Sequence, residues 1–217
     1  MAERCVQILV VHSLTLILLF SCYPHVINAT ESPPYTVVLS APDVEIRFYR
    51  DSSWISATVA GDGGTSYNKS THDGFHRLYQ YVRGRNEYNT RFKITTPTVT
   101  TITATSNGSS DYVVSMYMAS ISRPPMASPQ LNLRISNWKS HCVAVRTFSG
   151  FAGDDNIYEE RSLLLFSLAK SSILDGKNVS ISAERSSYSV AQYNASSHLS
   201  GRVNEAWINV VPCPFLH

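Results

Sequence analysis

One alternating pattern of residues occurs twice in this 217-residue chain, and that repeat limits the folds open to it. In the first copy, Val44–Phe48 alternates apolar and polar side chains, and residues 55–59 do the same. In the second copy, about 90 residues later, Leu131–Ile135 and Val143–Phe148 alternate likewise. A period of two with many β-branched residues is typical of half-buried strands. The sequence therefore predicts two copies of a strand pair.

A helix is predicted after the first strand pair. Ser70 with Asp73 is the expected start, and Gly84 with Asn86 is the expected end. Apolar residues spaced three and four apart give this segment one buried face, made of Phe75, Leu78, Tyr79 and Val82.

The second copy carries the same signals. Asn156 and Glu159 have the spacing of a capping box, and Asp175 with Gly176 predicts the end of the helix. Its apolar stripe is Leu164, Leu165, Leu168 and Ala169.

Two further strand candidates follow each helix. They are Lys93–Ala104 and Asp111–Ala119 in the first copy, then Ser187–Tyr193 and Glu205–Val211 in the second. The unit is therefore β-β-α-β-β, used twice, with internal repeats at about 36–120 and 130–211. Because one unit cannot cover both faces of its own sheet, we expect both to pack into one domain over 30–217. The predicted fold is α+β, a distorted antiparallel β-barrel or sandwich with two flanking helices.

Composition excludes several classes of protein. The chain is 43% hydrophobic and 16% charged, which supports a buried core and excludes wholesale disorder. A formal net charge of +2 argues against bulk nucleic-acid binding, which needs a strong basic excess.

The first 29 residues have the organisation of a secretory signal peptide. A short charged start at Met1–Arg4 precedes an apolar stretch at 6–20, and Pro24 with the small Ala29 marks a cleavage point. The alternative is a transmembrane anchor, for which the interrupted apolar run is short. We expect a secreted, extracellular protein, apoplastic if it comes from a plant, with no integral membrane segment in the mature chain.

Cysteines and glycosylation sequons agree with secretion. Cys142 and Cys213 are the only cysteines of the expected mature chain, and a disulfide between them would close a loop of about 70 residues, worth roughly 4 kcal/mol. Two free buried thiols are the alternative. Four Asn-X-Ser sequons predict glycosylation on exposed loops or edges, at Asn68, Asn107, Asn178 and Asn194.

Five segments resemble the SOUL family of heme-binding proteins, most strongly its secreted plant members. They are Val44–Tyr49, Gly74–Asn86, Ile94–Pro97, Val190–Asn194 and Gly201–Trp207, and in this order they span essentially the whole mature chain. The resemblance implies the duplicated, distorted barrel with two helices. It also implies a shallow apolar groove for heme or another tetrapyrrole, reversibly bound, between the first helix and the loop before the last strand.

The resemblance places the groove on particular side chains of this sequence. From the helix it would use Phe75, His76, Leu78, Tyr79 and Val82, and from the loop His198, Leu199 and Arg202. A porphyrin is a flat apolar plate with two carboxylates, so apolar walls with a few cations at the rim suit it. The alternative for the helix stripe is that it faces the barrel core.

Iron ligands are poorly represented among these positions. Phe48, which cannot coordinate iron, stands where some family members carry a histidine proposed as the ligand. His72 and His76 have the i, i+4 spacing of a helical metal pair, with solvated histidines as the alternative. His198 is either an axial ligand or an exposed loop histidine. We therefore expect no dedicated metal site.

Two functions remain, and neither is enzymatic, because the chain has no nucleophile elbow, phosphate loop or metalloprotease motif. The first is a secreted tetrapyrrole-binding protein, a possible carrier or buffer, that binds by apolar enclosure. The second is a secreted interaction glycoprotein that keeps the barrel and has lost the ligand. The sequence names no protein partner.

Overall fold

The computed structural model describes residues 6–7, 20–21, 30–59, 66–119, 123–175, 180–181, 187–195 and 197–213. The predicted signal peptide lies outside them, except for strands β1 (Val6–Gln7) and β2 (Phe20–Ser21), which pair with each other. In the described part of the chain, no helix is long and apolar enough to cross a membrane.

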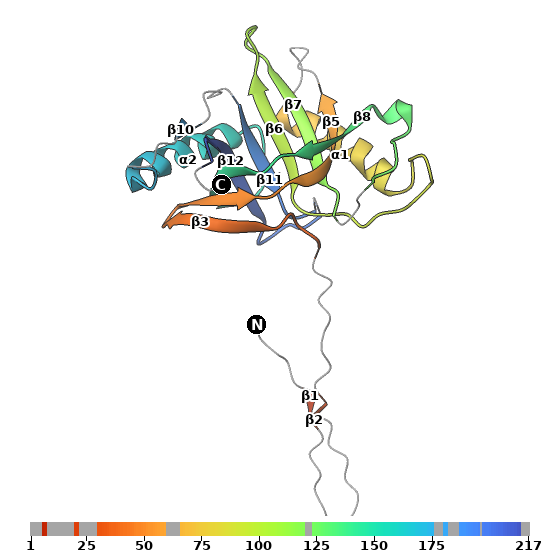
Figure 1. The fold of residues 1–217 in the computed structure, drawn as a ribbon, viewed down its shortest axis with the longest axis horizontal. Coiled ribbons are helices and arrows are strands. Elements are labelled where there is room, and N and C mark those ends of the chain that lie inside the picture. Colours follow the sequence, from red (N-terminus) through yellow and green to blue (C-terminus); the bar gives the residue numbers. More distant parts are fainter. Residues whose placement is uncertain are drawn as a thin grey trace, which may run out of the picture.

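A curled antiparallel sheet with two helices forms the body of the molecule (Figure 1), which confirms the predicted α+β class. The strand order is β3-β4-β9-β12-β11-β6-β7-β5-β8, and β10 pairs with β12. The strands are β3 (Tyr35–Ala41), β4 (Val44–Tyr49), β5 (Ser52–Val59), β6 (Thr98–Ala104), β7 (Ser110–Tyr117), β8 (Leu133–Trp138), β9 (His141–Ser149), β10 (Ser180–Ile181), β11 (Ser187–Gln192) and β12 (Val203–Val211).

The strand order from β4 to β8 is symmetric. The first copy comprises β4, β5, β6 and β7, and the second comprises their counterparts β8, β9, β11 and β12. When each strand is replaced by its counterpart, the result is the same strand order read from the other end. The copies meet where β6 pairs with β11. The first strand of each copy pairs within the other one, because β4 pairs with β9 and β8 with β5.

The two helices lie at opposite ends of the sheet (Figure 1). Helix α1 (Tyr67–Val82) packs on β5 and β7, and α2 (Ile157–Ser171) packs on β9 and β12. Side chains of a strand alternate between its two faces. On β9, Cys142 and Ala144 join the core under α2, whereas Val143 and Val145 join an aromatic-rich cluster on the other face.

Helix α1 begins earlier than the sequence predicted. Ser66 is its N-cap, and the Ser66 hydroxyl accepts a hydrogen bond from the Lys69 amide at 3.2 Å. The buried face continues from Leu78 back to Tyr67 through Gly74 and Ser70, two small residues that hide the apolar period. Gly74 is required there, because a Cβ atom would lie 2.4 Å from the Val114 Cγ2. The predicted stop is confirmed, since Arg83 is the C-cap.

Helix α2 differs from its predicted caps. Asn156 occupies the N-cap position, but its side chain accepts from the Gly153 amide and donates to the Phe151 carbonyl instead of capping α2. Asp154, which precedes α2 by three residues, accepts from the Tyr67 amide at 2.6 Å and so caps α1. The helix ends at Ser171, a few residues before the predicted stop.

Three strands differ most from the prediction. β3 was not predicted, because its outer edge is partly exposed and its alternation is weak. β6 begins at Thr98 rather than Lys93. It follows Pro97, which has no amide hydrogen to donate to a neighbouring strand. β8 begins at Leu133, because the 3-10 turn η1 (Pro129–Leu131) occupies the predicted start.

The predicted disulfide is present in the structure. Cys142 at the start of β9 is bonded to Cys213 just after β12, with a Cα–Cα distance of 5.1 Å. The bond joins the two ends of adjacent strands that are 71 residues apart in the chain.

Candidate functional site

A cavity of about 480 Å³ lies between the N-terminal half of α1 and the end of β11. The chain between α1 and β6 forms a second border. Thr71 holds the helix over the sheet, because its hydroxyl is 3.1 Å from the Thr100 hydroxyl on β6. The cavity falls within the size range of small-molecule sites.

The helix contributes residues one turn apart to the cavity wall. Tyr67, Thr71 and Phe75 follow the spacing i, i+4, i+8, and Asn68 and His72 border the same space. Phe75 is half-buried and its ring lies 6.2 Å from that of Tyr79. This wall is therefore part aromatic and part neutral polar.

The opposite wall comes from two chain segments that antiparallel pairing brings together. β6 and β11 pair so that Thr98 lies opposite Gln192. The lining residues on this side are Ile94, Thr95, Thr96, Thr98, Gln192, Tyr193, Asn194 and Ala195, and Thr30 adds to the rim.

Arg202 adds a buried positive charge to the lining of the cavity. Its Nη1 donates to the carbonyls of Ala195 and His198 at 2.7 and 2.8 Å, which fixes the loop before β12. The guanidinium lies over the Phe151 ring, 4.3 Å from its centroid. Its Nε atom is buried and has no hydrogen-bond partner within the described residues. Arg202 thus orders this wall and keeps one donor uncommitted.

The predicted groove residues of the helix lie in different surroundings. Phe75 lines the cavity, whereas Leu78 and Val82 are fully buried against β5 and β7 in the core, the alternative that the stripe left open. Tyr79 is half-buried beneath Arg83, whose guanidinium lies 5.5 Å from the ring. His76 is exposed.

The predicted loop residues also separate. Arg202 lines the cavity, as described above. His198 is exposed, and its carbonyl oxygen accepts a hydrogen bond from Arg202. Leu199 is 78% exposed, and neither residue borders the cavity.

His72 is the histidine that borders the cavity. Its side chain is 80% exposed, and its Nδ1 lies 3.1 Å from the Asp73 carboxylate. The His76 ring stacks beside it at 6.4 Å. Among the described residues, no group of three or more potential ligands is placed to hold a metal ion.

Sequence reasoning missed Tyr67, Thr71 and Tyr193 because it started α1 too late and limited the loop contribution to its tip. The i, i+4, i+8 spacing of the first two with Phe75 was the available signal.

The asparagines of three sequons lie in described segments, and that of the fourth does not. Asn107 is exposed in the β6–β7 turn, and Asn68 is exposed in the first turn of α1. Asn194 is half-buried, and its Oδ1 accepts from the Val203 amide at 2.7 Å. Asn68 and Asn194 both border the cavity. Asn178 lies outside the described residues, and glycosylation at all four stays a prediction.

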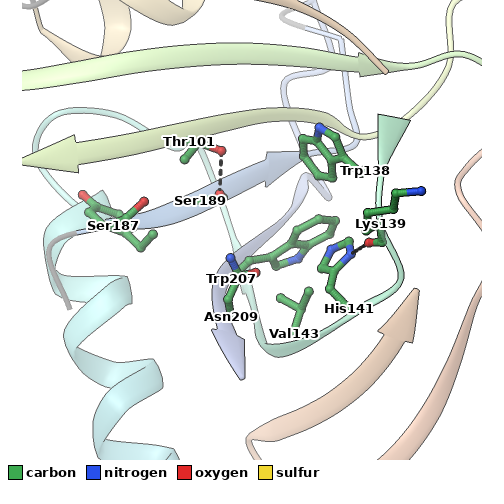
Figure 2. Close-up of a pocket in the computed structure, with 10 residues that line it drawn as sticks. Thr101, Trp138, Lys139, His141, Val143, Ser187, Ser189, Trp207 and Asn209 are labelled. Carbon is green, nitrogen blue, oxygen red and sulfur yellow. Dashed lines mark hydrogen bonds between the residues drawn. The ribbon is translucent and has the colours of Figure 1, made fainter. Parts of the chain in front are cut away.

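A second hollow of about 300 Å³ opens on the face of the sheet opposite the helices (Figure 2). Trp138, Trp207 and His141 form its aromatic side. Hydroxyl groups from β6 and β11 form the other side (Figure 2).

A buried carboxylate connects the walls of the two cavities. Glu205 Oε2 accepts from the Tyr193 hydroxyl and from the Trp207 Nε1, each at 2.8 Å. Its Oε1 accepts from Arg47 Nη1 at 2.9 Å. Burial, reinforced by the Glu205 charge, raises the pKa of Tyr193, so the hydroxyl stays protonated as a donor.

Fold and cavity together define a curled, duplicated sheet that offers a side pocket to a small molecule. The chain belongs to the SOUL heme-binding protein family, whose model matches residues 30–209. The resemblance noted in the sequence is thereby confirmed.

Two mammalian relatives align over most of the chain. "Heme-binding protein 2" of Homo sapiens is 29% identical over 168 residues, which cover 76% of each chain. The Mus musculus protein of the same name is 28% identical over 167 residues, again 76% of each chain.

Solved structures share the fold at very low identity. A chain described as a hydrolase encoded by lin2189 from Listeria innocua matches with a TM-score of 0.52 and 7% identity, over 77% of this chain and 91% of that one. A second structure of a Listeria innocua hydrolase gives a TM-score of 0.50 at 7% identity and the same coverage. At this identity the likeness concerns the fold alone.

Proposed function

We propose that this chain is a secreted tetrapyrrole-binding protein, a carrier or buffer rather than an enzyme. Its ligand would occupy the cavity between α1 and the end of β11. The observation that carries the proposal is that Phe75, Ile94 and Tyr193 line one space together with the buried Arg202. Family membership and the relatives named for heme binding support the same ligand class.

The lining residues fit the chemistry of a tetrapyrrole. A flat ring system gains most of its binding energy from apolar contact, and about 600 Å² of buried apolar surface gives roughly 15 kcal/mol at about 25 cal/mol/Å². Association costs about 4–15 kcal/mol, so at most about 11 kcal/mol remains, and a micromolar dissociation constant, which needs about 8 kcal/mol, lies within that limit. The guanidinium of Arg202, which lines the cavity, suits a ring carboxylate.

We infer that enclosure, rather than a strong axial histidine, holds the ligand. Phe48, at the position where some family members carry a histidine, packs with the core under α2 and does not border the cavity. His72 does border it, but its side chain is mostly solvated and bonded to Asp73. When bound, a heme iron would supply redox and ligand-exchange chemistry, and this chain's part would be to shield the ring from water.

Titration with heme and with iron-free protoporphyrin tests the mechanism, followed by absorbance and tryptophan quenching. We expect the two dissociation constants to agree within about three-fold, which is less than 1 kcal/mol. Iron-free ligand bound more than about ten-fold weaker, or heme binding lost in His72→Ala, would contradict enclosure without iron coordination.

Two side chains of the predicted groove provide a matched pair for locating the site. Phe75→Ala removes an aromatic wall and should weaken both porphyrins about ten-fold or more, because about 1.5–3 kcal/mol accompanies burial of such a side chain. Leu199→Ala removes a side chain that is apolar but solvent-exposed, and should leave both affinities unchanged. Equal effects of the two substitutions would place the ligand elsewhere.

A second candidate is a secreted interaction glycoprotein that has kept this fold and lost the ligand. The threonines of the cavity wall, at positions 30, 71, 95, 96 and 98, favour it because their hydroxyls add polar surface. No saturable signal at tens of micromolar porphyrin would support this second function over the first.

A further inference from the structure

The hollow on the helix-free face has one aromatic side. The Trp138 indole stacks on Trp54 at 4.2 Å and is itself only half-buried, and Trp207 lies beside it in the hollow (Figure 2). The His141 ring meets Trp138 edge-on at 6.0 Å and stacks on Tyr49 at 5.7 Å. These contacts fix the rings in place before any ligand arrives.

The other side of the hollow is a set of neutral hydrogen-bonding groups. Thr101 and Ser189 face each other across β6 and β11 with hydroxyl oxygens 2.9 Å apart, and Ser187 pairs with Thr103 at 3.2 Å. Each hydroxyl offers one donor and two acceptor sites, so a bonded pair still has a donor and acceptors to spare. The side-chain amide of Asn209, an exposed residue of the lining, offers both donors and an acceptor.

His141 adds a neutral acceptor to this set. Its Nδ1 lies 2.7 Å from the Lys139 carbonyl oxygen, which can only accept, so Nδ1 carries the proton and Nε2 keeps a lone pair. Burial lowers the pKa of His141, which keeps the ring uncharged near neutral pH.

Charge is confined to the rim of the hollow. Lys139 is the one charged residue among the described lining residues, and its ammonium is 3.3 Å from the Asp51 carboxylate. A charged ligand would find no free partner of opposite sign among these side chains. The lining therefore suits an uncharged molecule with an apolar face and many hydroxyl groups.

We propose that this hollow is a second binding site, for a neutral saccharide ring of monosaccharide size, which goes beyond the proposed tetrapyrrole function. One face of the sugar, lined by C–H groups, lies against the indoles of Trp138 and Trp207. The sugar hydroxyls, which both donate and accept, pair with Ser189, Asn209 and the Nε2 of His141. At about 300 Å³ the hollow is smaller than the cavity beside α1, which matches a ligand smaller than a tetrapyrrole.

Ligand-observed NMR and calorimetric titration of the full mature chain test this site. The probes are D-glucose, D-galactose, D-mannose and L-arabinose, each up to about 100 mM, because small neutral ligands of this kind bind with constants on the order of millimolar. We expect at least one sugar to bind saturably and to change tryptophan fluorescence.

Three substitutions locate the sugar. Ser189→Ala and Asn209→Ala should each weaken binding about five-fold, the effect of one lost hydrogen bond. Trp138→Ala should abolish saturation, and the two polar substitutions keep the test valid if that variant does not fold. Asn137→Ala is the matched control, because Asn137 is an exposed residue next to Trp138 that does not line the hollow.

The outcomes separate this site from the tetrapyrrole cavity. Sugar binding that survives Phe75→Ala but not Asn209→Ala supports the proposal even if porphyrin binding fails. No saturation by any of the four sugars, or equal binding in Asn209→Ala and Asn137→Ala, overturns it. Displacement of bound sugar by protoporphyrin with one-to-one competition also overturns it, because the two ligands would then share one site.

Discussion

The strongest energetic prediction concerns the buried carboxylate of Glu205. Its side chain is 6% exposed and that of Arg47 is 7% exposed, so the pair lies almost entirely out of solvent. Arg47, Tyr193 and Trp207 all donate to it. All three of these contacts to the carboxylate oxygens come from hydrogen-bond donors.

Glu205→Gln keeps the shape of the side chain but replaces one oxygen with a donor. If the new amide nitrogen faces Arg47, it meets a cation. If it faces the other side, Tyr193 can rotate its hydroxyl and accept, but Trp207 has only an N–H to offer. One donor–donor conflict therefore remains in either orientation.

The expected cost is about 3 kcal/mol of unfolding free energy. Breaking a buried ion pair by removing one charge costs about 3–5 kcal/mol, and the remaining Arg47–Glu45 contact at 2.7 Å offsets part of it. Urea denaturation followed by tryptophan fluorescence measures this, with an unchanged slope as the sign that the folded state is preserved.

Two companion variants calibrate the result. Tyr193→Phe removes one hydrogen bond to a charged group and should cost about 1.5–3 kcal/mol. Glu45→Gln acts on a side chain that is 36% exposed and should cost less than about 1 kcal/mol. The reasoning is refuted if Glu205→Gln costs no more than Glu45→Gln.

Three further predictions concern helix packing, helix capping and pH. Gly74→Ala should lower stability by about 1–3 kcal/mol through overpacking against Val114, and a double-mutant cycle with Val114→Ala should show coupling between them. Asp154→Asn should cost about 1 kcal/mol in thermal unfolding by weakening the cap of α1, whereas Asp155→Asn should not. The lowered pKa of His141 means that the unfolded chain binds more protons below about pH 6.5. Stability should therefore fall as pH drops from about 7 to 5, and a flatter profile in His141→Gln is the check; an unchanged profile would contradict it.

The alternation of apolar and polar residues predicted most strands of the sheet, because these strands are largely buried. β4, β9 and β12 have a core face under α2 and a second buried face, so their apolar residues stand out from the turns around them. β3 and the start of β8 are edge or turn segments, where exposure removes the alternating pattern. These were the segments that the sequence placed least well.

The cavity was predicted only in part, for reasons of packing. The predicted helix and loop do border the cavity, through Phe75 and Arg202. Periodicity alone does not distinguish the half of an apolar stripe that faces the sheet from the part that borders a pocket. Leu78 faces the core because α1 lies close to β7 at Gly74, a contact that depends on residues about 40 positions apart.

The hydrogen bonds that cross between copies were beyond sequence reasoning. Asp154 caps a helix 87 positions away, and Glu205 of the second copy accepts from Arg47 of the first. Such contacts follow from how the two copies dock, and neither copy shows them by itself.

The exchange of first strands between the copies has a consequence for dissection of the molecule. A fragment ending near residue 120 would carry β4 without its partner β9, and would leave β5 without β8. Two separately produced halves, cut within 123–129 between the two repeats, should therefore stay soluble only together and form one folded molecule when mixed. Cutting this protein at its midpoint would therefore yield two fragments that fold only with each other, as in a split reporter, and not two independent domains.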